Sequence, residues 1–152
     1  MLTDAPTDYS LTKAFFYHMK HKFLILFLSL ASVFAACKEA GQGGDAAIRG
    51  YVHVQKWNST FTQFISEFPA KDVYVYIIYG DRTFGYDDRV KTDFNGNFEF
   101  SYLYEGRYRV YTYSKDSTLN DPSGIVPVVR EINITDRKQF VELDTMLTFQ
   151  VK

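Results

Sequence analysis

Cysteine is the scarcest residue in this sequence, and its scarcity excludes two common ways of stabilising a small protein. The 152 residues include a single cysteine, Cys37, so neither an intramolecular disulfide nor a cysteine-based zinc site can form. Histidine is also scarce, because only His53 of the three histidines lies beyond residue 37. Any histidine-dependent catalysis in that part of the chain would therefore rest on this one residue.

The sequence also lacks a cluster of basic residues and an apolar run long enough to span a membrane. The formal net charge is −1 and no basic cluster is present, whereas a nucleic-acid partner calls for a basic face. The longest uncharged apolar run, from Phe23 to Ala36, is shorter than the ~20 residues that span a bilayer. Because Lys20, His21 and Lys22 precede it, the run is typical of a signal peptide.

The end of this run, Phe34-Ala35-Ala36-Cys37, resembles the lipobox of bacterial lipoproteins, although Phe34 stands where the family has an aliphatic residue. The resemblance implies cleavage before Cys37 and attachment of a diacylglyceryl group to its sulfur. Several acyl chains on one residue, such as palmitate, would hold the protein on a membrane, whereas a single chain is marginal. An ordinary secretory signal that ends near a buried cysteine is the alternative.

A second methionine, Met19, would begin a compact and complete signal peptide. The preceding residues carry Asp4 and Asp8 where positive charge is expected, so they look like an extension upstream of the true start. The sequence therefore predicts an extension over residues 1–18, a lipoprotein signal peptide over 19–36, a Gly-rich tether over 37–45 and a folded domain over 46–152.

The residues directly after the cysteine bear on localisation. Lys38 and Glu39 resemble the surface-export signal of some Gram-negative outer-membrane lipoproteins. We therefore expect a lipid anchor in the outer membrane and display at the cell surface, with a plain solvated linker as the alternative.

The part of the chain beyond Cys37 is rich in residues that favour strands, since it has 10 Tyr, 9 Phe and one Trp. Hydrophobic residues alternate with polar ones between turn residues, and no window has the period of an amphipathic helix. Strands are expected over residues 47–57, 72–79, 98–100, 108–114, 125–134 and 140–151. Residues 58–70 could form either one short helical turn or a packed loop, and residues 115–124 a long loop.

The alternation also predicts which side chains face the core. Ile48, Gly50, Val52 and Val54 should point inward, and so should Val73, Val75 and Ile77, while their neighbours, including Ile78, point outward. Asn95-Gly96 between two alternating runs predicts a hairpin with a type I′ turn. Pro127 restricts the strand over 125–134 to a sheet edge or a strand start.

Three blocks of this pattern resemble the carboxypeptidase-regulatory-like domain. They are Ile48-x-Gly50-x-Val52, Ala70-x-x-Val73-x-Val75 and Thr92-Asp93-x-Asn95-Gly96-x-Phe98-x-Phe100-x-x-Leu103-x-x-Gly106-x-Tyr108-x-Val110. The resemblance covers about residues 46–152 and implies an all-β fold, a seven-stranded antiparallel β-sandwich that is transthyretin-like or Ig-like. Such domains act mostly as spacers, adhesive modules or partners of larger assemblies, and the fold does not choose among these.

Catalysis and metal binding find little support in the residues. His53 alternates with Val52 and Val54 and should lie on the outward face, and the Arg-Gly-Ser-like C-terminus of transthyretin-related hydrolases is absent, so we expect no enzyme. A calcium site is a weaker alternative to ordinary turn chemistry, because the order of an EF-hand loop fails; no cofactor is expected. Its candidate ligands are Asp87, Asp88, Asp93 and Asn95.

The outward aromatic side chains are the strongest candidates for a binding surface. They are Tyr51, Trp57, Tyr74, Tyr76, Tyr111 and Tyr113, with Arg107 and Arg109 beside the last two. Such rings suit stacking on sugars or protein partners, although cross-strand aromatic pairs can simply stabilise a sheet. The first hypothesis is a non-enzymatic lipoprotein that serves a structural or interaction role at the envelope. A glycan-binding lipoprotein is the alternative, and a transthyretin-like hydrolase the third.

Overall fold

The computed structural model describes residues 39–152, so the predicted extension, the signal peptide and the lipid attachment at Cys37 lie outside the described residues. Within this range the regular structure consists of nine strands and no helix, and hence includes no helix that could cross a bilayer. The strands are β1 (Gln42–Trp57), β2 (Phe64–Pro69), β3 (Tyr74–Tyr79), β4 (Asp88–Lys91), β5 (Asn97–Leu103), β6 (Gly106–Lys115), β7 (Ile125–Ile134), β8 (Phe140–Glu142) and β9 (Met146–Val151).

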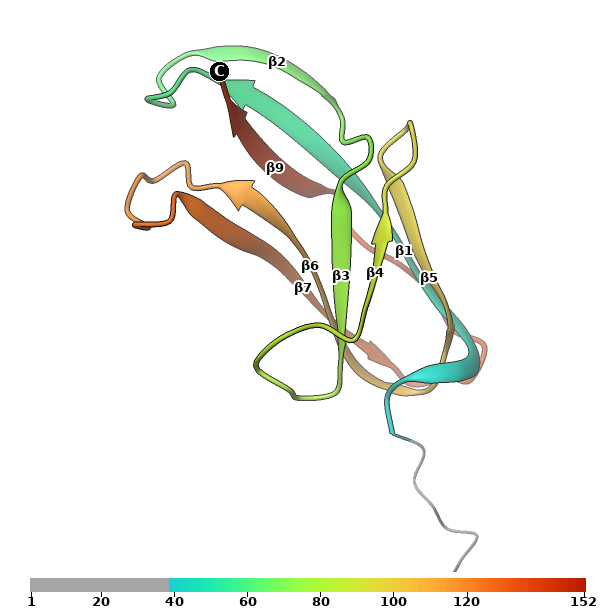
Figure 1. Cartoon of the computed structure of the whole chain (residues 1–152). Helices are drawn as coiled ribbons and strands as arrows, with labels where there is room; N and C mark the ends of the chain where they lie inside the picture. The colour runs from blue at the N-terminus through green and yellow to red at the C-terminus, as the bar shows by residue number, and fades with distance from the viewer. Residues whose placement is uncertain (1–38) are drawn as a thin grey trace, which may run out of the picture. The chain divides into compact units, whose positions relative to one another are not determined.

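Strand β1 is the centre of a five-stranded sheet because it is long enough to pair with two shorter strands along each edge (Figure 1). The backbone of Val52 accepts a hydrogen bond from Ala70 and donates one to Gly96, which places β2 and β5 on the same edge. The opposite edge pairs with β8 and β9, and both of these run parallel to β1.

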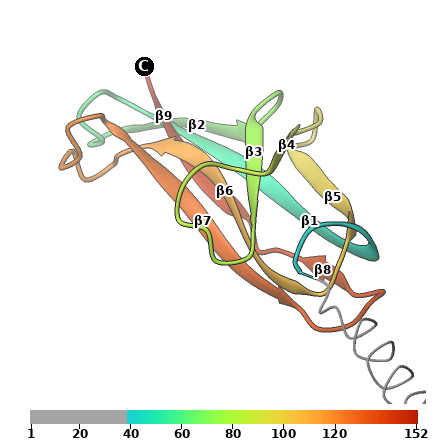
Figure 2. The same ribbon diagram turned by 60° about the horizontal axis from the view of Figure 1, so that its bottom comes forward.

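The second sheet has four strands in the order β4-β3-β6-β7, all antiparallel. Strands β6 and β7 run side by side over their full length in both views (Figure 2). Among the described strands β7 pairs only with β6, so it forms an edge, as Pro127 predicts. Its bounds, Ile125–Ile134, agree with the expected strand.

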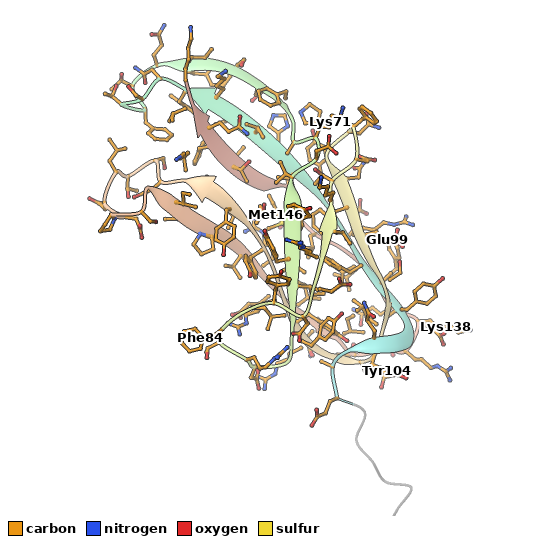
Figure 3. The ribbon with its side chains drawn as sticks, viewed as in Figure 1. Lys71, Phe84, Glu99, Tyr104, Lys138 and Met146 are labelled. Atoms are coloured by element: carbon orange, nitrogen blue, oxygen red, sulfur yellow. The ribbon has the colours of Figure 1, made fainter. Side chains whose placement is uncertain are left out.

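The core fills the space between the two sheets. Ile48, Val52 and Val54 of β1 are at most 1 % exposed, which confirms the inward series predicted for this strand. Gly50, the remaining member, lies opposite Phe98, whose ring would be 2.5 Å from a Cβ at that position. Met146 is fully buried between the sheets (Figure 3), so the alternation in sequence corresponds to a single continuous core.

Two expectations about the architecture need correction. The described sandwich has nine strands rather than seven, and its pairing is mixed rather than wholly antiparallel, because β8 and β9 lie parallel to β1. Residues 58–70 contain a strand, β2, rather than a helical turn or a packed loop. Hydrophobic and polar residues alternate little in β2, because both faces of this strand are largely exposed. Its backbone pairing with β1 is what identifies it as a strand.

The Asn95-Gly96 turn is not a hairpin turn. β4 before it belongs to the four-stranded sheet and β5 after it to the five-stranded sheet, so the turn carries the chain from one sheet to the other. Of its two central residues only Gly96 has a positive φ, of 82°, whereas a type I′ turn needs two such residues. The Asp93 carboxylate accepts hydrogen bonds from Asn95 and Asn97, and the Asn97 amide holds its pKa below the usual range.

The loop between β6 and β7 is ordered around a single carboxylate. Asp116 accepts hydrogen bonds from the backbone amides of Thr118, Asn120 and Asp121, and also from the Thr118 hydroxyl. These donors, with the Asp121 amide contributing most, lower the pKa of Asp116 to about 2. The long loop predicted over residues 115–124 is therefore a structured turn that connects β6 to β7.

Candidate functional site

The outer face of the four-stranded sheet collects tyrosines from two adjacent strands. Residues directly opposite on antiparallel strands share a face, and the register places Tyr76 opposite Tyr111, with Arg89 on the β4 side and Val129 on the β7 side. Tyr74 and Tyr113 lie two residues further along β3 and β6 on the same face. Tyr86, from the loop between β3 and β4, joins them. We call Tyr74, Tyr76, Tyr86, Tyr111 and Tyr113 the tyrosine face.

Tyr76 is the centre of this arrangement. Its ring stacks on Tyr111 with centroids 5.1 Å apart and planes within 17°. It also contacts Tyr86 at 5.0 Å and Tyr113 at 5.8 Å, both at steeper angles. Tyr74 lies 6.2 Å away on the other side. These distances fall within the range of favourable aromatic pairs, so the five rings form one packed layer over the sheet.

This layer is open to solvent at its rim. Tyr74 is 38 % exposed, Tyr86 48 % and Tyr113 52 %, whereas Tyr76 and Tyr111 are half-buried beneath them. Burial, followed by the neighbouring Tyr113, raises the pKa of Tyr111 to about 12. Its hydroxyl therefore stays protonated at neutral pH and donates to the backbone oxygen of Gly85, 3.3 Å away.

Two cations border the tyrosine face on β4. The guanidinium of Arg89 lies 4.4 Å from the centroid of Tyr74 and 5.8 Å from that of Tyr86. The ammonium of Lys91 lies 5.1 Å from the Tyr74 ring. Cation–π contacts of this kind hold a positive charge against an aromatic surface without neutralising it.

A hollow of about 290 Å³ continues the tyrosine face toward β7. The loop between β3 and β4 forms one wall, and Phe84 on that loop projects away from the ribbon (Figure 3). The side chains that border it include Ile78, Arg109, Tyr111, Tyr113, Pro127 and Val129. Ile78 is on the outward face as expected, and it is only 6 % exposed there.

Two of the predicted face residues lie elsewhere. Tyr51 and Trp57 belong to β1 and therefore to the five-stranded sheet. The Tyr51 hydroxyl lies 3.1 Å from His53 Nδ1, and the Trp57 ring packs edge-on against Phe64 at 5.6 Å. The predicted aromatic surface is thus divided between two sheets, and four of its six members gather on one of them.

His53 lies on the outer face of the five-stranded sheet, as its position in β1 predicts. Glu67 Oε2 is 3.6 Å from His53 Nε2, on the side opposite Tyr51. Among the described residues no serine or cysteine forms a hydrogen bond with His53. Its surroundings are therefore a tyrosine hydroxyl and a glutamate carboxylate.

The residues considered for calcium are not brought together. Asp87 forms an ion pair with Arg82, and Asp88 accepts a hydrogen bond from Gln42 at 2.8 Å. Asp93 and Asn95 lie beyond the other end of β4, in the turn that leads to β5. In residues 39–152 no group of three histidine, cysteine or acidic side chains is placed to hold a metal ion.

Sequence reasoning missed Tyr86 and Arg89. β4 has only four residues and half-exposed side chains, so its alternation is too short to predict. The available signal was the aromatic pair Phe84 and Tyr86 in a loop with Gly85, since large aromatic residues are unusual in an exposed loop.

Comparison with known proteins identifies no family. No family model matches the chain, and no curated protein matches it. A Pseudomonas aeruginosa structure described as that of a candidate carbohydrate-binding protein has 13% identity and a TM-score of 0.42, over 77% of this chain and 94% of that one. A 9R-lipoxygenase from Cyanothece PCC8801 has 19% identity and a TM-score of 0.27, over 90% of this chain and 23% of that one. These are distant likenesses of fold, and the carboxypeptidase-regulatory-like resemblance stays a prediction.

Proposed function

We propose that the chain is a non-enzymatic, lipid-anchored envelope protein whose β-sandwich binds carbohydrate through the tyrosine face. The observation that carries the proposal is the layer of five tyrosine rings on one side of the four-stranded sheet. A pyranose ring has an apolar face of C–H groups and a rim of hydroxyls. A tyrosine offers the complementary combination of an apolar ring and a polar hydroxyl, and so suits stacking on sugars.

Three features favour a binding surface over rings that only stabilise the sheet. The outer rings are 38–52 % exposed, so a large part of their area is not used in packing. The hollow beside Tyr111 and Tyr113 offers a place for a sugar that follows the stacked one. Arg89 and Lys91 keep unneutralised charge at the rim, where hydroxyl or acidic groups of a ligand would lie.

The anchor belongs to the same proposal and rests on the lipobox-like sequence before Cys37. Acyl chains on Cys37 would hold the domain at the outer membrane, and the residues that follow favour display at the cell surface. A glycan ligand fits that location because envelope surfaces present polysaccharides to a tethered domain at high effective concentration. Carbohydrate binding is one form of the interaction role predicted from sequence. Binding of a protein partner is the other form.

Removing the two exposed rings that flank the centre should weaken binding strongly. The full chain, purified in a non-ionic detergent, is tested by biolayer interferometry against immobilised neutral and acidic polysaccharides. We expect the wild type to bind at least one of them and the Tyr74→Ala/Tyr113→Ala double variant to lose at least about tenfold in affinity, since stacked aromatic residues dominate such interfaces.

Tyr102→Ala is the matched control, because Tyr102 is 74 % exposed but lies on β5 in the other sheet. It should bind like the wild type. No binding of the wild type to any polysaccharide, or equal binding by the double variant, would overturn the proposal and leave a protein partner as the better account.

A further inference from the structure

We infer that the ligand of the tyrosine face is an anionic glycan, and that Arg109 and Arg89 bind its acidic groups. This inference rests on the proposed function and adds the chemical class of the sugar. It comes from the way the arginines of the domain are paired, from the position of Arg109 in the hollow, and from the charge of the face.

The pairing of the arginines singles out the tyrosine face. Residues 39–152 contain seven arginines, and four of them form ion pairs with carboxylates: Arg49 with Glu99, Arg82 with Asp87, Arg107 with Asp81, and Arg137 with Asp45. Arg130 donates to the backbone oxygens of Val129 and Thr145. The two whose guanidinium groups have no described hydrogen bond or ion pair are Arg89 and Arg109, and both lie on this face.

Arg109 lines the hollow together with Tyr111. It projects from β6 on the outward face, between Ile78 of β3 and Glu131 of β7. Its Nη2 atom is buried and has no hydrogen-bond partner. A buried donor without a partner is destabilising, and more so when it is charged. Because Arg109 also lines the hollow, we assign its guanidinium as the anion site, with the acceptor supplied by a ligand that binds there.

The charges of the face agree with this assignment. Arg89, Lys91 and Arg109 stand against Glu131, directly opposite Arg109 on β7, whereas the nearby carboxylates of Asp81 and Asp87 are paired with Arg107 and Arg82. No ion pair within 4 Å joins Arg109 to Glu131 in the described structure. Since the whole chain has a formal charge of −1, this positive strip is a local feature rather than a general excess of basic residues.

The geometry points to a sugar chain rather than to a free anion. Arg109 lines the same hollow as Tyr111 and the exposed Tyr113, so a sugar stacked on these rings would lie beside the guanidinium. A guanidinium binds a carboxylate through two parallel hydrogen bonds and binds a sulfate ester by similar contacts. The shared chemistry is therefore an acidic sugar, either uronate or sulfated.

The test compares polysaccharides that differ in charge. Polygalacturonate and alginate supply carboxylates, dextran sulfate supplies sulfate esters, and dextran and laminarin are neutral. We expect the full chain to bind an acidic polymer at least about tenfold more tightly than either neutral one, with Arg109→Gln removing most of that difference. The carboxylate and sulfate arms identify which acidic group is preferred.

Three variants make the test specific. Arg137→Gln changes the net charge by the same amount as Arg109→Gln. Arg137 lies in the loop between β7 and β8, outside the tyrosine face, and pairs with Asp45 of β1, so this variant should bind like the wild type. Glu131→Gln should strengthen binding, because it removes the carboxylate directly opposite Arg109. Arg89→Gln should weaken acidic binding even if Arg109→Gln fails to fold.

The outcomes separate this inference from the proposed function. Equal affinity for dextran and polygalacturonate, still lost in the Tyr74→Ala/Tyr113→Ala variant, would overturn the inference and keep a carbohydrate-binding face. An equal loss in Arg137→Gln and Arg109→Gln would also overturn it, because the attraction would then be nonspecific. Absence of binding to every polymer would overturn both.

Discussion

Tyr76→Ala is expected to lower glycan affinity by about 30-fold or more, the largest effect of any single substitution on the tyrosine face. Tyr76 contacts each of the other four rings, so its loss removes the central platform and the support of its neighbours. Central, well-packed aromatic residues typically contribute 2 kcal/mol or more to binding, which corresponds to a factor of about 30. Biolayer interferometry against the tightest-binding polysaccharide measures the change.

The phenylalanine variant separates the ring from its hydroxyl. Tyr76→Phe keeps the stacked layer and should retain most of the affinity, because the apolar face of the ring supplies the contact. If Tyr76→Ala folds like the wild type by circular dichroism and binds with unchanged affinity, the layer of rings stabilises the sheet and does not bind a ligand.

Tyr108→Ala should produce the largest loss of stability. The side chain is 1 % exposed and packs against Tyr79 with ring centroids 5.7 Å apart. Truncating a buried aromatic residue costs about 3–5 kcal/mol, a large share of the roughly 5–15 kcal/mol that stabilises a domain. Urea unfolding of the full chain, followed by the fluorescence of the single tryptophan, Trp57, measures the free energy of unfolding.

The Tyr108 hydroxyl has a role of its own. It accepts a hydrogen bond from the Gly41 amide at 3.0 Å and lies 2.7 Å from the backbone oxygen of Tyr104, to which it can donate. Tyr108→Phe removes both hydrogen bonds and should cost about 1–3 kcal/mol. Tyr102→Phe, at an exposed position, should cost almost nothing. Equal unfolding midpoints for Tyr108→Ala and the wild type would contradict the assigned core.

The inward and outward faces of the long strands were predictable from sequence. β1 buries every second residue from Gly44 to Val54, including the four predicted from sequence, so period-two alternation leads directly to the structure. β2 and β4 were not predictable, because one is exposed on both faces and the other has only four residues. Their pairing with β1 and β3 is a tertiary effect.

The assignment of strands to sheets also lay beyond local sequence. Asp93 and Gly96 form the same tight turn whether the flanking strands pair with each other or enter different sheets. The outcome depends on the pairing of β5 with β1 and of β4 with β3. These pairings join residues that are far apart in the chain. Local turn chemistry therefore predicts the turn at Asn95-Gly96 but not whether its flanking strands pair with each other.

The candidate site shows the same division. Alternation correctly predicts that Tyr74, Tyr76, Tyr111 and Tyr113 face outward, and antiparallel register then brings them together. Tyr51 and Trp57 have the same alternation but separate from them, because β1 belongs to the other sheet. Which outward residues share a surface is therefore decided by the topology.

Protection of individual tyrosines by bound glycan tests the central claim most directly. The full chain is treated with tetranitromethane with and without a saturating amount of the tightest-binding polysaccharide, and nitration at each tyrosine is read by peptide mass spectrometry. The account predicts protection of Tyr86 and Tyr113, with nitration of Tyr102 unchanged. Unchanged nitration of Tyr86 and Tyr113 while the polysaccharide is bound would show that the tyrosine face is not the binding surface.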